Sequence, residues 1–394
     1  MITTTDWKQT RLGNEVELLY GKGLPASARI TGEIPVYGSN GIVGFHNKSL
    51  VEGPGIIVGR KGSVGEIAFS DGPFWPIDTT YYVSNRGSND WRFLYFLLRH
   101  LQLTELNSHS TIPGLNRESV YSIEWTFPQR AEQEKIAAVL WKIQKALEIE
   151  EASVRSERDL KKSLLRRLFT HGLSGDPLKE TEIGMLPQSW EVQRISDVAK
   201  ISSGGTPDRA ISRYWQNGTI PWVKTGEINY CIINDTGEKI TEAGLRNSAA
   251  RMYPQGTLLI AMYGQGITRG RVAILGIEAA INQACGAFLL NDEIVTEYLY
   301  HYLTFAYERL RSLAHGANQQ NLNARLVSQL QFPKPSKQEQ RDIANALQTV
   351  DRKIDTHESK KHSLQELFKT MLHKLMTAQI RVNDLDIDTT EVTA

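Results

Sequence analysis

The chain has 394 residues, 40% hydrophobic and 23% charged, a composition typical of a soluble globular protein with two or more domains. Its formal net charge is +1, whereas nucleic-acid-binding proteins usually carry an excess of basic residues. A protein with a net charge near zero can still have a basic patch on one face. The two cysteines, Cys231 and Cys285, lie far apart, so the sequence predicts no disulfide framework, no zinc site and a cytoplasmic location; it also predicts no secretory signal and no membrane span.

Residues 1–130 are predicted to form a first globular unit of mixed α/β (α+β) structure. Gly55–Gly59 and Val64–Phe69 are β-type runs, and the segment Arg60-Lys61-Gly62-Ser63 between them predicts a hairpin with a basic tip. A helix is expected at Trp91–Leu103.

Residues 131–171 predict a first long helix, because apolar residues recur at alternating steps of four and three with no Pro or Gly among them. A helix of about 40 residues would be roughly 60 Å long. Residues 172–186, rich in Gly, Pro and acidic residues, are predicted to be a linker.

A second globular unit is predicted at 187–335, with β-type runs at Gly256–Ala261 and Arg271–Leu275 and a helix at Thr296–Leu313. A second long helix follows at 336–380, and 381–394 is predicted to be a disordered tail.

The two long helices are copies of one another. Glu132-Gln133 recurs as Glu339-Gln340, and the same offset of 207 positions relates Leu160 to Leu367 without a gap. Two heptad seams of this length predict an antiparallel coiled coil and a pseudo-twofold repeat of unit and helix. The alternative is two amphipathic helices that pack on separate domain cores.

Antiparallel pairing with matched centres would place Ile136 opposite Leu375 and Glu150 opposite Lys361, the second pair as an ion pair that sets the register. The residues predicted to pair the helices are Ile136, Leu140, Ile143, Leu147, Glu150, Ile343, Leu347, Val350, Ile354, Lys361 and Leu375.

Several segments carry a family resemblance: Leu186-Pro187-Gln188-Ser189-Trp190, Ser203-Gly204-Gly205-Thr206-Pro207, Ile34–Gly41, Ile281-Asn282-Gln283 and the Glu-Gln-x-x-Ile-Ala-x-x-Leu start of each long helix. Their order and duplication resemble the specificity subunits of Type I restriction–modification systems over nearly the whole chain. The resemblance implies two target-recognition domains that read an asymmetric, two-part DNA site. It also implies helices that space these domains and dock two methyltransferase subunits, through which restriction subunits join.

Base reading requires polar side chains on loops that can enter a groove of double-stranded DNA. The candidate DNA contacts are Lys22, Tyr37, Ser39, Asn40, Arg60 and Lys61 in the first unit, and Thr206, Lys224, Tyr263, Gln265, Arg269, Arg271, Asn318 and Gln319 in the second. Each has a simpler interpretation as a turn residue or a solvated surface charge. His109 and His315 are better explained as turn residues than as catalytic bases.

The sequence contains no phosphate-binding Gly-x-x-x-x-Gly-Lys-Ser/Thr loop, no Asn/Asp-Pro-Pro-Tyr segment and no zinc-spaced His/Cys cluster. We therefore expect no cofactor, metal or catalytic residue in this chain, and expect S-adenosylmethionine and ATP with Mg²⁺ to bind partner subunits. Three alternatives remain: the recognition subunit of a related system that cuts on both sides of its site, a coiled-coil interaction scaffold, and an enzyme that acts on DNA.

Overall fold

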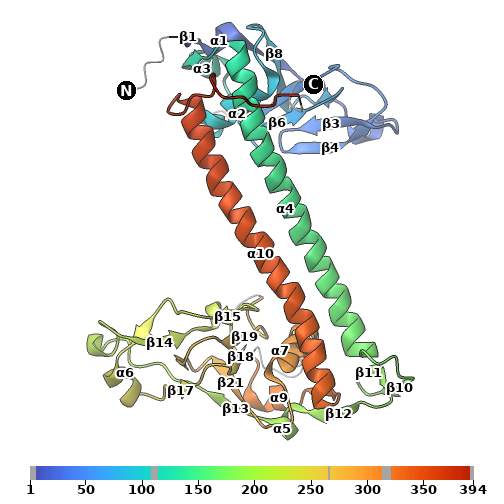
Figure 1. Cartoon of the computed structure of the whole chain (residues 1–394), viewed down its shortest axis with the longest axis vertical. Coiled ribbons are helices and arrows are strands. Elements are labelled where there is room, and N and C mark those ends of the chain that lie inside the picture. The colour runs from blue at the N-terminus through green and yellow to red at the C-terminus, as the bar shows by residue number, and fades with distance from the viewer. Residues whose placement is uncertain (1–5, 108–113, 265–266, 313–320, 391–394) are drawn as a thin grey trace. The chain divides into compact units, whose positions relative to one another are not determined.

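A computed structural model describes residues 6–107, 114–264, 267–312 and 321–390. The chain divides into a first unit, residues 1–152 with 357–394, and a second unit, residues 153–356. The two long helices, α4 (Arg130–His171) and α10 (Lys337–Met376), each contribute one half to each unit (Figure 1).

The first unit contains three sheets, in which most neighbouring strands are antiparallel, together with short helices and the beginning of α4. Its strand orders are β2-β8-β5-β6, β4-β3-β7 and β1-β9. The elements are β1 (Lys8–Arg11), α1 (Leu12–Glu15), β2 (Val16–Tyr20), η1 (Ala26–Ala28), β3 (Ile34–Gly38), β4 (Gly41–His46), β5 (Gly55–Gly59), β6 (Ile67–Ser70), β7 (Trp75–Pro76), β8 (Thr80–Asn85), α2 (Trp91–His100), η2 (Leu103–Asn107), α3 (Arg117–Tyr121) and β9 (Glu124–Phe127).

The second unit has the strand orders β13-β21-β18-β19-β15, β16-β14-β20-β17 and β12-β22. Its elements are β12 (Glu191–Arg194), α5 (Ile195–Val198), β13 (Ala199–Ser203), η3 (Ser212–Tyr214), β14 (Ile220–Val223), η4 (Thr225–Glu227), β15 (Ile232–Ile233), β16 (Lys239–Ile240), α6 (Glu242–Arg246), β17 (Met252–Tyr253), β18 (Leu258–Ala261), β19 (Val272–Leu275), β20 (Ala279–Ile281), β21 (Cys285–Leu290), α7 (Thr296–Phe305), α8 (Tyr307–Ser312), α9 (Ala324–Ser328) and β22 (Gln331–Lys334).

The two units have the same topology. The order β2-β8-β5-β6 corresponds strand by strand to β13-β21-β18-β19, and β4-β3-β7 corresponds to β16-β14-β20, with β15 and β17 added at sheet edges of the second unit. The mixed α/β fold with an internal repeat and two long helices, as predicted from the sequence, is confirmed.

The first turn of each long helix is bonded to its own sheet domain by the repeated Glu-Gln pair. Gln133 is buried and accepts a hydrogen bond from the N–H of Asp90, while Gln340 accepts one from the N–H of Val295, each at 2.8 Å. Both glutamine side chains also donate to the carbonyl of the proline that ends the preceding strand segment. These bonds explain the repeated motif, because they fix each domain to its helix.

The long helices pack antiparallel in both units. In the first unit, Ile136 and Leu140 of α4 share a core with Leu375 near the end of α10. In the second, Leu168 near the end of α4 shares a core with Ile343 near the start of α10. Every apolar position predicted to pair the helices is buried or half-buried.

The predicted ion pair between Glu150 and Lys361 is wrong. The Glu150 carboxylate instead contacts His357 Nδ1 at 2.5 Å and Lys360 Nζ at 3.9 Å. His357 is the repeat counterpart of Glu150, so the two meet at the centre of the pseudo-twofold pairing. Lys361 lies about one turn further along α10, where it pairs with Glu358 of its own helix.

The two segments that follow the long helices differ from prediction. The predicted linker contains a β-hairpin, β10 (Leu178–Thr181) with β11 (Gly184–Pro187). The predicted disordered tail is wrong for 381–390, since Val382 is buried in the first unit's core and the tail crosses the start of α4 (Figure 1). Apolar residues such as Val382, together with Arg381, hold this segment against the unit. The sequence prediction missed this because the segment is polar on average.

Candidate nucleic-acid interface

In each unit, two parallel strands of the smaller of the two main sheets have their carboxyl ends side by side. These strands are β3 and β7 in the first unit, and β14 and β20 in the second. The residues beyond these strands make equivalent hydrogen bonds. The N–H of Ile77 donates to the carbonyl of Tyr37 at 2.9 Å, and that of Asn282 donates to the carbonyl of Val223 at 3.0 Å. The side chains that follow these strands therefore gather at the carboxyl-terminal end of the sheet in each unit. We call this end of the sheet the strand edge.

A glycine-rich loop closes against each strand edge. A Cβ at Gly21 would lie 2.1 Å from the Ile77 oxygen, and one at Gly204 would lie 1.8 Å from the Ile281 oxygen. Only glycine permits this approach. The loop Gly21-Lys22-Gly23, which contains the candidate Lys22, and the family segment Ser203–Pro207 are thus equivalent structures.

The strand edge of the first unit brings together five of its six candidate DNA contacts. Arg60 donates from Nε and Nη2 to the Asp78 carbonyl at 3.1 and 2.6 Å, which directs its guanidinium to the edge. The other candidates there are the half-buried Ser39 and the exposed Lys22, Asn40 and Lys61.

Two arginines share a pair of tyrosine rings beside this edge. The Arg60 guanidinium lies 5.3 Å from the Tyr20 ring centre and 5.9 Å from that of Tyr81, and Arg117 lies 4.8 and 6.0 Å from the same rings. Neither arginine forms an ion pair with a carboxylate in the described part of the chain. Burial raises the pKa of Tyr81, so this phenol stays neutral. Tyr20, Tyr81 and Arg117 were not predicted, because no local motif marks them.

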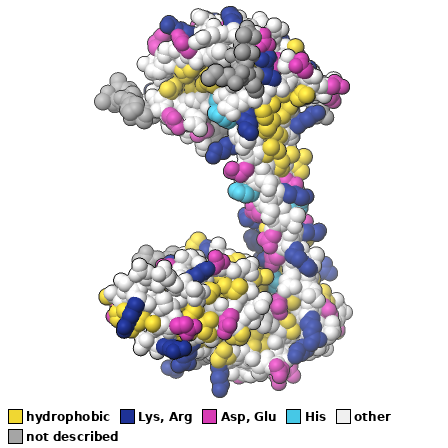
Figure 2. All heavy atoms as spheres, turned by 60° about the vertical axis from the view of Figure 1, so that its left-hand side comes forward, with side chains coloured by type: hydrophobic (Ala, Val, Ile, Leu, Met, Phe, Trp, Pro, Cys, Tyr) yellow, Lys and Arg dark blue, Asp and Glu magenta, His cyan; other side chains and the backbone are white. Residues whose placement is uncertain are grey.

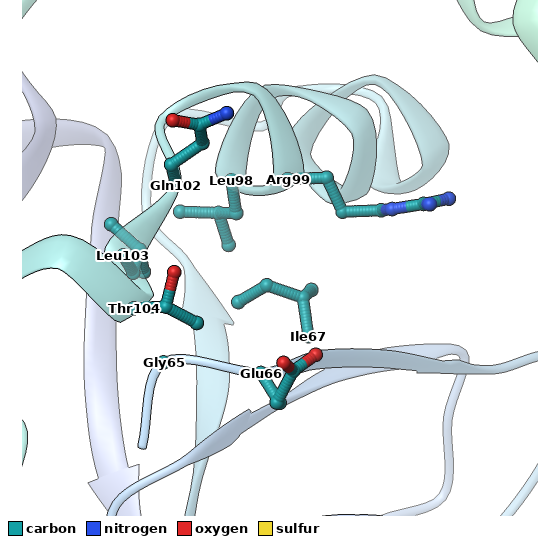
Figure 3. Close-up of a pocket in the computed structure, with 8 residues that line it drawn as sticks. All are labelled: Gly65, Glu66, Ile67, Leu98, Arg99, Gln102, Leu103 and Thr104. Atoms are coloured by element: carbon teal, nitrogen blue, oxygen red, sulfur yellow. The ribbon is translucent and has the colours of Figure 1, made fainter. Parts of the chain in front are cut away.

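A small pocket of about 180 Å³ lies between β6 and α2, next to the turn that presents Arg60 (Figure 3). Gly65 has a φ of +79°, and a Cβ there would lie 2.4 Å from the Thr104 nitrogen. Figure 3 shows the Arg99 guanidinium pointing away from Gln102 and Thr104; it donates to Gln144 at 2.9 Å instead. The close approach of Gly65 to Thr104 therefore packs the end of the turn against η2.

The strand edge of the second unit has a different set of side chains on the same framework. Thr206 donates to Gln283, which follows β20, and Lys224 follows β14. Arg209, from the loop before η3, lies 3.7 Å above the Trp215 ring. Gln283 and Arg209 were not among the predicted contacts, although Gln283 belongs to a quoted family motif.

The remaining candidates of the second unit have varied positions. Tyr263 is exposed, and Arg271 donates from Nη1 to Asn229 at 2.6 Å with its guanidinium 5.7 Å from the Tyr230 ring centre. Arg269 is only 8% exposed, which contradicts its predicted role as a surface contact. Gln265, Asn318 and Gln319, like His109 and His315, lie outside the described residues.

Tyr37 is also a wrong prediction. Its side chain is 7% exposed, its hydroxyl donates to the Phe69 carbonyl at 3.3 Å, and burial raises its pKa. Tyr37 occupies an inward position of β3 and packs edge-on against Phe74. Its neighbours in sequence, Ser39 and Asn40, lie beyond the strand end and stay accessible.

Charge is distributed without a single dominant basic face on the visible side of the second unit, where Lys and Arg side chains alternate with Asp and Glu (Figure 2). This pattern agrees with the net charge of +1. No group of three or more His, Cys, Asp or Glu side chains within the described ranges could hold a metal ion. None of the helices described is long and apolar enough to cross a membrane.

The family model for the Type I restriction modification DNA specificity domain matches residues 5–156 and 187–366. The chain belongs to this family of specificity subunits. Its relatives include the MjaVIII specificity subunit of Methanocaldococcus jannaschii, 23% identical over 97% of this chain and 94% of the relative. The MjaIX specificity subunit of the same organism is 31% identical over 48% of this chain, and that match spans 45% of the relative.

Solved structures show the same fold. The crystal structure of a Type I restriction–modification S subunit from M. genitalium aligns over 95% of this chain and 98% of its own, with a TM-score of 0.72 at 18% identity. A structure described as the basis of complex assembly and conformational transition in the type I system aligns over 95% of this chain and 99% of its own, with a TM-score of 0.54 at 16% identity. At these identities, the likeness concerns the fold.

Proposed function

We propose that this chain is the non-catalytic DNA-recognition subunit of a Type I restriction–modification enzyme, acting in the cytoplasm on an asymmetric two-part target. The observation that carries the proposal is that one framework recurs in two units with unlike side chains at the strand edge. Asn40 and Arg60 mark the first unit, while Thr206 and Lys224 mark the second. Two readers of the same construction but different chemistry suit two different half-sites.

The long helices are proposed to dock two methyltransferase subunits, through which restriction subunits join. Each unit exposes one apolar helix position that has an exposed repeat counterpart in the other unit. Leu160 of α4 is 44% exposed and Leu367 of α10 is 45% exposed. Equivalent exposed leucines favour two copies of one partner. S-adenosylmethionine and ATP with Mg²⁺ are proposed to bind these partners.

The test is to co-express the chain with the methyltransferase subunit from its genome and to map methylated bases by single-molecule sequencing. One split, asymmetric motif that disappears on deletion of the chain is expected. Arg60→Ala should relax base preference at one half-site only, at a cost of about 1–3 kcal/mol in discrimination. The control Arg86→Ala removes an arginine that follows the opposite end of β8 and is paired with Glu17.

Two outcomes would contradict the proposal. Methylation that is unchanged by deletion, with no DNA retained by the purified complex at low salt, would favour the interaction scaffold. A motif with cleavage on both sides would favour the related restriction system. Equal effects of Arg60→Ala and Arg86→Ala would remove Arg60 from the DNA interface while leaving the role of the chain intact.

A further inference from the structure

Three charged side chains meet beside the strand edge of the second unit. Arg209 Nη1 donates to one oxygen of the Glu238 carboxylate at 2.5 Å, and Lys224 Nζ donates to the other at 2.6 Å. These hydrogen bonds lower the pKa of Glu238, with the larger effect from Lys224. All three side chains are at least 31% exposed, and ion pairs this open to solvent contribute little to stability. Stability alone therefore gives a weak reason for the arrangement.

The two cations are positioned by more than the carboxylate. The guanidinium of Arg209 lies over the rings of Trp215 and Trp222, at 3.7 and 5.1 Å from their centres. Lys224 directly follows β14, and its backbone N–H donates to Glu227 at 2.7 Å. A guanidinium and an ammonium group that converge on two oxygens of one anion would suit the two non-bridging oxygens of a phosphodiester equally well.

The fold does not require a carboxylate at this position. Strands β3 and β4 pair in the same register as β14 and β16, which makes Gly44 the counterpart of Glu238. In the first unit, Arg29 reaches this place and donates from Nη1 to the Val43 carbonyl at 2.6 Å. An arginine thus approaches the strand pair in both units, and only the second unit adds the acid.

We propose that Arg209 and Lys224 form a binding site for one backbone phosphate of the DNA duplex, and that Glu238 occupies this site in the DNA-free protein. Phosphate and carboxylate then exclude one another, so Glu238 lowers the affinity of the second unit for DNA of any sequence. Binding at this phosphate becomes dependent on favourable contacts elsewhere, which restrains non-specific binding. The inference rests on the proposed DNA-recognition function.

The experiment measures binding of the full-length chain, with its methyltransferase subunit, to a 30-base-pair duplex of unrelated sequence between 50 and 200 mM salt. Glu238→Gln keeps the shape of the side chain but releases both cations. We expect about 5- to 10-fold tighter binding near 100 mM salt and a salt slope steeper by about 0.9, the value for one added phosphate contact. Adding Arg209→Ala and Lys224→Ala should abolish the gain.

The matched control is Glu242→Gln, which removes one negative charge from the same unit, where Glu242 pairs with Arg246 on α6. It should change affinity less than about 2-fold, since exposed charges at a distance are screened. A second variant, Arg209→Ala with Lys224→Ala in the natural background, should reduce the salt slope on a duplex that contains the target sequence, where favourable contacts elsewhere let the phosphate displace Glu238. This measurement does not depend on the stability of Glu238→Gln.

The outcomes separate this inference from the proposed function. If the natural complex binds DNA but Glu238→Gln binds unrelated DNA no more tightly than Glu242→Gln, or if the double alanine variant keeps its salt slope on the target duplex, the phosphate site is wrong and DNA recognition stands. If the natural complex does not bind DNA at low salt, the proposed function itself fails.

Discussion

His301 is a buried titratable group with no counterpart in the first unit. Its side chain is fully buried, and among the described residues neither ring nitrogen has a hydrogen-bond partner. Burial, reinforced by the nearby charge of Lys161, lowers the pKa of His301 to about 3. The imidazole is therefore neutral near neutral pH, and its 4.0 Å separation from Asp351 is not an ion pair. By the repeat, Phe96 takes its place in the first unit, where its ring contacts Phe368.

His301→Phe should make the second unit less sensitive to acid. The unfolded histidine gains a proton below a pKa of about 6.5, whereas the folded one does so only near 3. Stability is thus lost as the pH falls below about 6.5, by about 2 kcal/mol at pH 5. Urea unfolding at pH 7.5 and 5.0 should show a smaller difference for the variant. Exposed His362→Gln is the control, and an unchanged difference in His301→Phe would refute the assignment.

At the scale of single residues, the sequence predicted the location of the candidate loops at the strand edge better than the exposure of each side chain. Arg60 and Lys61 were predicted from a basic hairpin tip, and they do lie at the strand edge. Tyr37 and Arg269 have equally suitable side chains but are buried. Strand alternation and loop closure decide which way a residue points, and these depend on contacts that are remote in sequence. Arg117 reaches Tyr20 by such a contact.

The long helices were predictable as elements because a heptad pattern is local. The polar contacts between the two helices were not predictable, because each contact depends on the register of the pairing and on the rotamer of the side chain in the facing helix. Lys161 pairs with Asp351 in the second unit, whereas the repeat counterparts in the first unit are Phe368 and Gln144. Asp351 has a raised pKa because of its burial, so this layer of the second unit is polar where that of the first is largely apolar.

The exposed leucines of the helices predict two separable docking sites. Leu160→Glu and Leu367→Glu should each remove one of two methyltransferase subunits, with at least a tenfold loss of affinity at that site, because each places a charge in an apolar contact. The combined variant should bind none. Masses of the purified complexes by multi-angle light scattering measure the stoichiometry. Leu289→Glu, 47% exposed on β21, is the control. Two bound subunits in the combined variant would exclude this surface.

Across the whole molecule, the segments that follow the two long helices perform the same task. Each segment hydrogen-bonds the glutamate in the first turn of the other long helix. After α4, the N–H of Leu173 donates to Glu339 at 3.0 Å, and the Trp190 indole donates to the same carboxylate at 2.9 Å. After α10, Arg381 Nε donates to Glu132 at 2.7 Å, and the Trp7 indole donates to it at 3.0 Å. The helix repeat was visible as an offset of 207 positions, but this equivalence was not, because the segments share no sequence pattern.

Loss of Arg381 should therefore destabilise the first unit and leave the second intact. Arg381 bonds both oxygens of Asp6 as well as Glu132, and Glu132 is only 4% exposed. In Arg381→Ala this carboxylate keeps the Trp7 indole but loses its cation, at a cost of about 3 kcal/mol. Lysine should rescue little of this, because it cannot bond two carboxylates in a fixed plane.

The measurement is hydrogen exchange followed by mass spectrometry, which resolves the two units in one chain. Faster exchange in β1, β9 and the first turns of α4, with unchanged exchange in β12 and β22, is expected for Arg381→Ala. Glu132→Gln combined with Arg381→Gln should restore much of the protection, because no buried charge is then unpaired. Arg246→Ala, which removes an exposed arginine of α6, is the control. If Arg381→Ala exchanges like the natural chain, the tail only rests on the surface, and the structural equivalence of the two post-helix segments has no energetic basis.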